Sequence, residues 1–323
     1  MEDNFLLSLK RDYRANPPQF FYENPSHRRV SFCSNGDYLA GWRPSCSHAR
    51  SVLFREVNSG TLSSMGHASI IFGSFKFLRV LDLEFVVVDS FSTELNHLRY
   101  LAVQTTESSI PSSIENLWNF QTFIVKRTEG QEVQLPDTFW RLIKLRHVCI
   151  STRASFNLHN AEESLDASPS KLDNLATLSS PYVSRAEDMK RILSKTPNLR
   201  KLKCELGDSW ENRFPVLVSL HRLETLKAHF SKFPKVGPSR LNFPLNLKKL
   251  TLCNFYLPPS EISIIAKLVN LEILKLQQVV FEREEWEVID EEFPKLKLLK
   301  LENLELSQWS ASDEAFYNLR RLV

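Results

Sequence analysis

Residues that could bind a metal or act as a nucleophile are scattered along this chain of 323 residues. Cys33, Cys46 and His48 form the only grouping near zinc-ligand spacing, and they lack the second close pair that a structural zinc site needs. The eight glycines form no phosphate-binding loop, and no G-x-S-x-G nucleophile elbow occurs. We therefore expect no catalytic residue, no metal, no cofactor and no enzymatic activity in this chain.

Basic side chains are the residues whose spacing carries chemistry. They concentrate at positions two and one before, and one and three after, a recurring apolar anchor. Counted from Val52 onward, these positions hold seventeen Lys or Arg residues against six Asp or Glu residues, whereas the whole chain has a formal net charge of only +3. Positive charge gathered on one face favours an acidic partner. We expect these residues to contact a partner: Arg50, Arg79, Arg99, Arg146, Tyr100, Lys203, Lys227, Lys249, Lys275 and Lys300.

Some of these charges have expected partners within the chain. Two positions before the anchors, five charges alternate in sign along the later repeats and predict a ladder of ion pairs: Arg200, Glu224, Lys248, Glu272 and Lys297. The earlier row of arginines does not alternate, and its only acidic neighbours are Asp82 and Glu84. This row predicts a contact surface for an acidic protein. The alternative is that long basic side chains only cover apolar neighbours.

Nucleic acid is not expected as a partner. Aromatic residues among the basic ones are sparse, with Tyr100 the main example, and the net charge is modest.

The elements that position these charges follow the pattern Leu-x-x-Leu-x-Leu, which recurs every 20 to 30 residues. This period is typical of a leucine-rich-repeat solenoid. We expect an α/β horseshoe of about 12 repeats, with one parallel β-sheet on its concave face and irregular or short helical convex returns. The middle apolar residues of the repeats, taken as anchors, are Val30, Val52, Leu81, Leu101, Phe123, Val148, Leu178, Leu202, Leu226, Leu250, Leu274, Leu299 and Leu322.

Residues 247–268 show how one repeat works. Leu250 and Leu252 point inward from a strand while Lys249 and Thr251 point outward, because side chains alternate along a strand. A short helical turn follows from Ser260. In the repeat before residue 200, Ser184-x-x-Glu187 fits a capping box for a helix over 185–195.

The chain is expected to be a piece of a longer protein. Residues 1–27 predict a helix and linker from a missing upstream domain, and residues 28–323 a solenoid that is truncated at its C-terminus, with a loop insertion near 151–171. Five cysteines in no paired spacing, the absence of a glycosylation sequon and the acidic start favour a cytoplasmic protein without a transmembrane segment.

The lead-in FLLSLKRDYRANPPQFFYENPSHRRVSF resembles the junction between the nucleotide-binding module and the repeats in plant coiled-coil NLR disease-resistance proteins. HARSVLF, FLRVLDLE, LNHLRYLAV, SIPSSIENLWNFQTFIV and LPDTFWRLIKLRHV resemble repeats of that class, and most of all those of late-blight-resistance homologues of nightshade plants. The coiled coil, the P-loop and the methionine-histidine-aspartate motif of the family are absent from this chain.

The resemblance implies the repeat module of an intracellular immune receptor, with possible peripheral membrane association of the full receptor. ATP or ADP would be bound only by the upstream module. The first repeats would restrain that module, and the later ones would recognise a pathogen effector or a host guard protein, which leads to defence and the hypersensitive response. Two other classes stay open: a substrate adaptor of a ubiquitin ligase or another scaffold, and an extracellular repeat protein.

Overall fold

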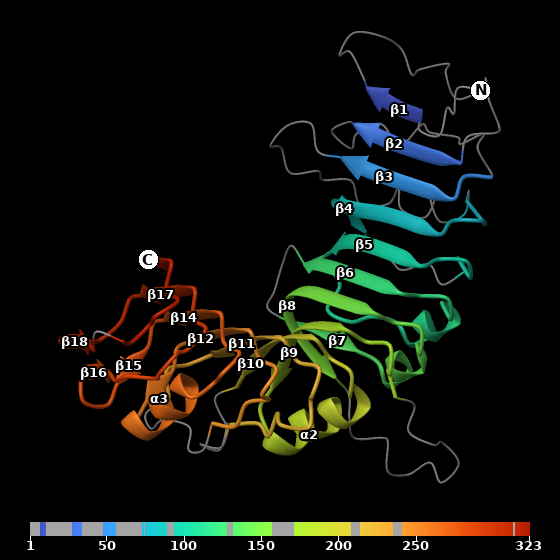
Figure 1. Cartoon of the computed structure of the whole chain (residues 1–323). Helices are drawn as coiled ribbons and strands as arrows, with labels where there is room; N and C mark the ends of the chain where they lie inside the picture. The colour runs from blue at the N-terminus through green and yellow to red at the C-terminus, as the bar shows by residue number, and fades with distance from the viewer. Residues whose placement is uncertain are drawn as a thin grey trace. The chain divides into compact units, whose positions relative to one another are not determined.

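The computed structural model describes residues 7–10, 28–33, 48–55, 73, 75–88, 94–127, 132–156, 171–207, 214–234, 241–312 and 314–323. They belong to two compact units, Met1–Asn174 and Leu175–Val323. In each unit, parallel strands lie side by side, one strand for each repeat (Figure 1). The expected fold class, a leucine-rich-repeat solenoid built on a parallel sheet, is therefore confirmed.

The first unit holds a ladder of parallel strands, each shorter than eleven residues. Its six anchors, Val30, Val52, Leu81, Leu101, Phe123 and Val148, pair in register from strand to strand. Two 3₁₀ helices, η3 (Ser112–Asn116) and η4 (Asp137–Arg141), lie in the returns. The strands are β1 (Leu7–Lys10), β2 (Arg29–Cys33), β3 (Ser51–Arg55), β4 (Val80–Val88), β5 (Tyr100–Thr105), β6 (Thr122–Arg127) and β8 (His147–Phe156), and β7 (Glu132–Leu135) pairs with β8.

The second unit repeats the design with helices α2 (Ala186–Lys195) and α3 (Pro259–Ala266) in its returns. Its seven anchors, from Leu178 to Leu322, also pair in register. The main strands are β9 (Thr177–Val183), β10 (Lys201–Leu206), β11 (Thr225–Phe230), β12 (Lys249–Cys253), β14 (Ile273–Gln277), β17 (Leu298–Glu302) and β19 (Arg321–Leu322). Two small sheets pair β13 (Tyr256–Leu257) with β15 (Val280–Phe281) and β16 (Glu285–Val288) with β18 (Gln308–Ala311).

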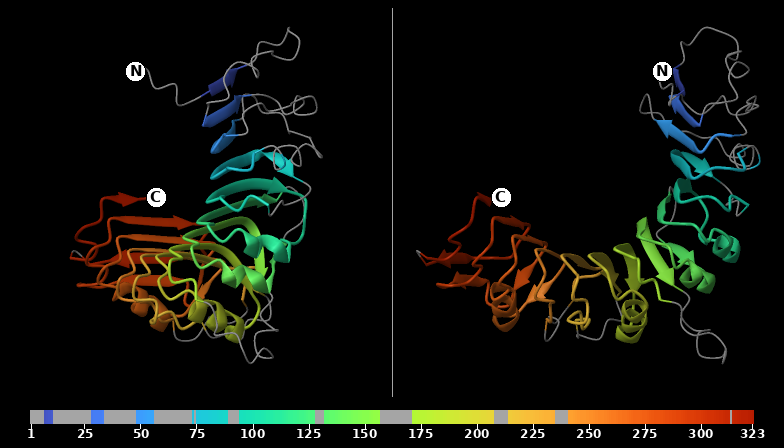
Figure 2. Two further views of the ribbon diagram at one scale, coloured as in Figure 1. Left: turned by 90° about the vertical axis from the view of Figure 1, so that its right-hand side faces the viewer. Right: turned by 45° about the vertical axis from the view of Figure 1, so that its right-hand side comes forward.

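The core of each unit lies between its sheet and its returns. In β10, Leu202, Cys204 and Leu206 are buried while Lys201 and Lys203 are exposed. Each buried leucine contributes about 1.5–3 kcal/mol of transfer free energy, and neighbouring repeats share that burial. The helices α2 and α3 cover one side of the sheet of the second unit and leave its other side open to solvent (Figure 2).

Two expected boundaries are wrong. Leu7–Lys10 is strand β1 instead of part of a helix, because Leu7 pairs with Val30 and extends the ladder by one strand. The rest of 1–27 lies outside the described residues. The loop expected near 151–171 cannot begin at 151, because β8 continues to Phe156 and its second half pairs with β7. Residues 157–170 lie outside the described part of the chain.

Candidate functional site

The arginines of the first unit lie in a row at one end of its strands. Arg50, Arg79, Arg99 and Arg146 are all exposed. Their backbones hold the row together, because the N–H of Arg79 donates to Arg50 O and that of Arg99 to Arg79 O, both at 2.8 Å. The row therefore follows the ladder of the sheet, as its spacing predicts.

The row has two members that the sequence reading missed. Gln121 lies between Arg99 and Arg146, since the N–H of Arg146 donates to Gln121 O and that of Gln121 to Arg99 O. Arg28 adds an exposed arginine before Arg50 and accepts the Arg50 N–H at 2.8 Å. The sequence could have predicted Arg28, because this residue lies two positions before the anchor Val30, as the other arginines of the row do before theirs. We call Arg28, Arg50, Arg79, Arg99 and Arg146 the arginine row.

Among the described residues, no carboxylate lies within 4.0 Å of any guanidinium of the arginine row. The two acids expected nearby are turned to other groups. Glu84 accepts Lys126 Nζ at 2.7 Å, and Asp82 Oδ1 accepts the Glu84 N–H at 3.1 Å. Within the described residues of this unit, no ion pair therefore neutralises the positive charge of the row.

Beside the arginine row, the open face of the sheet carries apolar side chains on either side of Asp82, and Ser51 and Thr122 also lie on it. Leu53, Val80 and Ile124 are half-buried there, and Ala102 is buried between its neighbours on the same face. Sequence reasoning used these positions only to count charges and so overlooked the face. We call Leu53, Val80, Tyr100, Ala102 and Ile124 the apolar face.

Tyr100 is the aromatic member of the apolar face. Its burial, followed by the nearby Asp82 and Glu84 carboxylates, raises its pKa to about 12. The phenol therefore stays protonated and can donate a hydrogen bond throughout the neutral range. This is the aromatic residue that the sequence predicts among the basic ones.

In the second unit, the predicted ladder of ion pairs is present. Glu224 lies between two bases, with its Oε1 at 3.9 Å from Arg200 Nη2 and 4.0 Å from Lys248 Nζ. Glu272 accepts Lys297 Nζ at 2.8 Å, and this hydrogen bond lowers its pKa. These exposed pairs stabilise the unit only slightly. Because Glu272 and Lys297 pair with each other, neither offers a free charge to a partner.

The lysines that the sequence selected in this unit share the open face of the sheet. Lys203 pairs in register with Lys227, and Lys275 with Lys300. Lys249 stands one row away on β12. Lys300 differs from the others because its Nζ lies 2.7 Å from Glu302.

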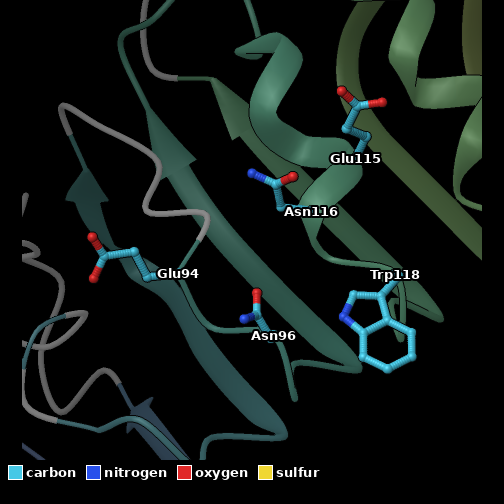
Figure 3. A pocket seen from close by; sticks show the side chains of 5 residues that line it. All are labelled: Glu94, Asn96, Glu115, Asn116 and Trp118. Carbon is cyan, nitrogen blue, oxygen red and sulfur yellow. The ribbon is translucent and has the colours of Figure 1, made fainter.

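A shallow hollow lies in the first unit, lined by Glu94, Asn96, Glu115, Asn116 and Trp118 (Figure 3). Glu115 already accepts Arg141 Nη1 at 2.6 Å, and Lys144 Nζ lies 5.1 Å from the centre of the Trp118 ring. The hollow thus offers chiefly the exposed part of Trp118.

Within the described ranges, no group of three His, Cys, Asp or Glu side chains could hold a metal ion. In the same ranges, no helix has the length and apolar character needed to span a bilayer.

A stack of parallel strands with buried leucine anchors, and with its charges on an open sheet face, defines a leucine-rich-repeat protein. The model of the family described as "Leucine-rich repeat region" matches residues 48–323, so the chain belongs to this family. An internalin from Listeria monocytogenes gives a TM-score of 0.49 at 12% identity, covering 86% of this chain and 81% of that one.

Similarity to plant resistance proteins covers the whole chain. It is 44% identical over 327 residues to the putative late blight resistance protein homolog R1B-16 of Solanum demissum, which matches all of this chain and 25% of the relative. The late blight resistance protein R1-A of the same plant is 41% identical over 339 residues, again with all of this chain and 25% of the relative. The chain thus spans about a quarter of the length of these relatives, and the expected resemblance is confirmed.

Proposed function

We propose that this chain is the protein-binding repeat module of a plant disease-resistance receptor, and that its first unit restrains an upstream nucleotide-binding module. Similarity over the whole chain to late blight resistance proteins supports the receptor class. The module is non-catalytic and cytoplasmic in this proposal. Any ATP or ADP is bound by the upstream module and not by the repeats.

The observation that carries the proposal is the arginine row next to the apolar face. Exposed guanidinium groups that pair with no carboxylate among the described residues can form charge-assisted contacts with an acidic surface. The half-buried Leu53, Val80 and Ile124 supply the apolar centre that a protein contact needs. Together they fit a protein partner whose contact surface is apolar at its centre and acidic along one edge.

Recognition of a pathogen effector or a host guard protein is the second part of the proposed function. Repeat proteins can vary their surface while the buried anchors keep the scaffold constant. The buried anchors occupy fixed positions in each repeat, whereas the outward positions differ from repeat to repeat. The alternative roles, adaptor of a ubiquitin ligase or another scaffold, would use the same open faces with a different partner.

The test is a binding measurement with a separately expressed nucleotide-binding module from a late-blight-resistance relative. Arg79→Glu combined with Arg99→Glu should weaken binding about tenfold or more at low salt, because two attractive charges become repulsive. Lys171→Glu combined with Lys190→Glu is the matched control, since both side chains are exposed and the net charge change is the same. Equal affinity of the two variants would refute the role of the arginine row.

A further inference from the structure

The open face of the second unit is unusually rich in lysine. On β10, β11, β12, β14 and β17, three in-register rows give fifteen outward positions, which are one before, one after and three after each anchor. Six of these positions are lysines and two are glutamates, a net charge of +4. We call five of the lysines the lysine face: Lys201, Lys203, Lys227, Lys249 and Lys275.

The lysine face keeps a net positive charge within the described part of the unit. Among the described residues, no carboxylate lies within 4.0 Å of these five ammonium groups, and the sixth lysine, Lys300, is the one that pairs with Glu302. The other acid on this face, Glu205, stands beside His229 at the far end of the strands. Like charges this close repel one another, and a bound anion would relieve that repulsion.

The register places the five lysines on one area of the sheet. Lys203 and Lys227 are on adjacent strands and therefore about 4.8 Å apart at their backbones. Lys275 is two strands beyond Lys227, with Thr251 between them. The five residues thus span an area about 14 Å wide, because β10 and β14 are three strand spacings apart.

The neighbours of the lysine face point to a small anion more than to a protein. Protein interfaces depend on apolar or aromatic side chains at their centre, as on the apolar face of the first unit. Between these lysines lie the hydroxyl groups of Thr225 and Thr251 and a single apolar side chain, that of Ile273. Flexible ammonium groups suit phosphates, which they bind as point charges from several directions.

We infer that the lysine face is a binding site for a compact, multiply phosphorylated anion, held by Lys201, Lys203, Lys227, Lys249 and Lys275. This assigns a small-molecule ligand to Lys201 and to four lysines for which the sequence predicts a protein partner. The phosphates could be free, as in an inositol polyphosphate, or carried by a phosphoinositide headgroup. The inference does not depend on the role of the arginine row in the first unit.

The experiment uses the whole chain and isothermal titration calorimetry with myo-inositol hexakisphosphate. We expect one site per chain, with an affinity that falls as salt rises. The affinity should fall by about a thousandfold in the triple variant Lys203→Gln, Lys227→Gln and Lys275→Gln. This corresponds to about tenfold for each charge-assisted contact that is lost. The control is Lys190→Gln, Lys267→Gln and Arg283→Gln, which removes the same charge at exposed positions away from this face. Lys201→Gln with Lys249→Gln is a second variant in case the triple variant does not fold.

Two further arms decide the nature of the ligand. Vesicles with phosphatidylinositol bisphosphate test the headgroup source, and poly-glutamate tests an acidic protein segment. Binding of inositol hexakisphosphate or of these vesicles that the lysine variants lose and the control keeps supports the inference and names the source. No binding of either, equal weakening in both sets of variants, or a preference for poly-glutamate would overturn it.

Discussion

Asn270 Nδ2 donates to Leu245 O at 2.9 Å, and Asn270 Oδ1 accepts Lys295 Nζ, also at 2.9 Å. One side chain thus joins three consecutive repeats of the second unit. Asparagines four residues before other anchors donate in the same way to the preceding repeat: Asn119 to Asn96 O, Asn174 to Ile143 O, Asn246 to His221 O and Asn318 to Pro294 O. These hydrogen bonds fix the spacing of the repeats along the edge of each sheet.

Asn270→Ala should lower the free energy of unfolding of the chain by about 1 kcal/mol, because the Leu245 carbonyl and the Lys295 ammonium both lose a partner. Urea denaturation measures the change as a shift in midpoint. Asn242→Ala is the control, since this exposed asparagine makes no hydrogen bond to the described residues. Equal midpoints for the two variants would show that the edge hydrogen bonds do not stabilise the stack.

Gln278 has a φ of 52°, a left-handed conformation that costs a non-glycine residue about 1 kcal/mol. The equivalent residues of the neighbouring repeats are Asn254 and Asn303, at φ 57° and 53°, and asparagine tolerates this region best after glycine. Gln278→Asn should therefore raise the free energy of unfolding by about 0.5 kcal/mol, whereas the β-branched Gln278→Val should lower it. A higher urea midpoint for Gln278→Val than for Gln278→Asn would contradict this explanation.

The ion-pair ladder predicts a specific acid sensitivity. The hydrogen bond from Lys297 holds the pKa of Glu272 below its ordinary value of 4.5, so the folded carboxylate binds a proton more weakly than the unfolded one. Its stabilisation is therefore complete above pH 4.5 and is lost as the pH falls through the lowered pKa. The urea midpoint of the native protein should exceed that of Glu272→Gln slightly at pH 7, and the difference should vanish in acid. A difference that is the same at pH 7 and pH 3 would be the contrary result.

The cysteines should differ in reactivity. Cys204 is buried, and burial raises its pKa to about 12, so almost no thiolate exists at neutral pH. Cys149 lies half-buried on the open side of β8. Brief alkylation followed by peptide mass mapping should label Cys149 in the native protein and Cys204 only after unfolding. Rapid labelling of Cys204 without denaturant would contradict its place in the core.

The leucine spacing predicts the register of both ladders correctly, because burial of an apolar residue at each anchor admits only one alignment of neighbouring strands. The charge pattern likewise predicts the ion pairs of Glu224 and Glu272. Both depend on the position of a residue within its repeat, which the sequence states directly.

The errors concern features that the repeat pattern does not encode. The N-cap of α2 is Arg185, without a side-chain capping bond, so the capping box predicted from Ser184 and Glu187 is wrong. The continuation of β8 to Phe156 depends on its pairing with β7, which has no leucine motif of its own. The edge asparagines could have been found, because each one stands directly before the first apolar residue of its repeat, which is Phe120 after Asn119 and a leucine after the other four.

The most direct test of the proposed function uses Cys149, which pairs in register with Ile124 of the apolar face. The alkylation rate of Cys149 is measured with and without the nucleotide-binding module of a late-blight-resistance relative, in the native chain and in Arg79→Glu with Arg99→Glu. We expect the module to slow alkylation of Cys149 severalfold in the native chain and to have little effect on the variant. Binding of the module to both chains with no change in the Cys149 rate would contradict it.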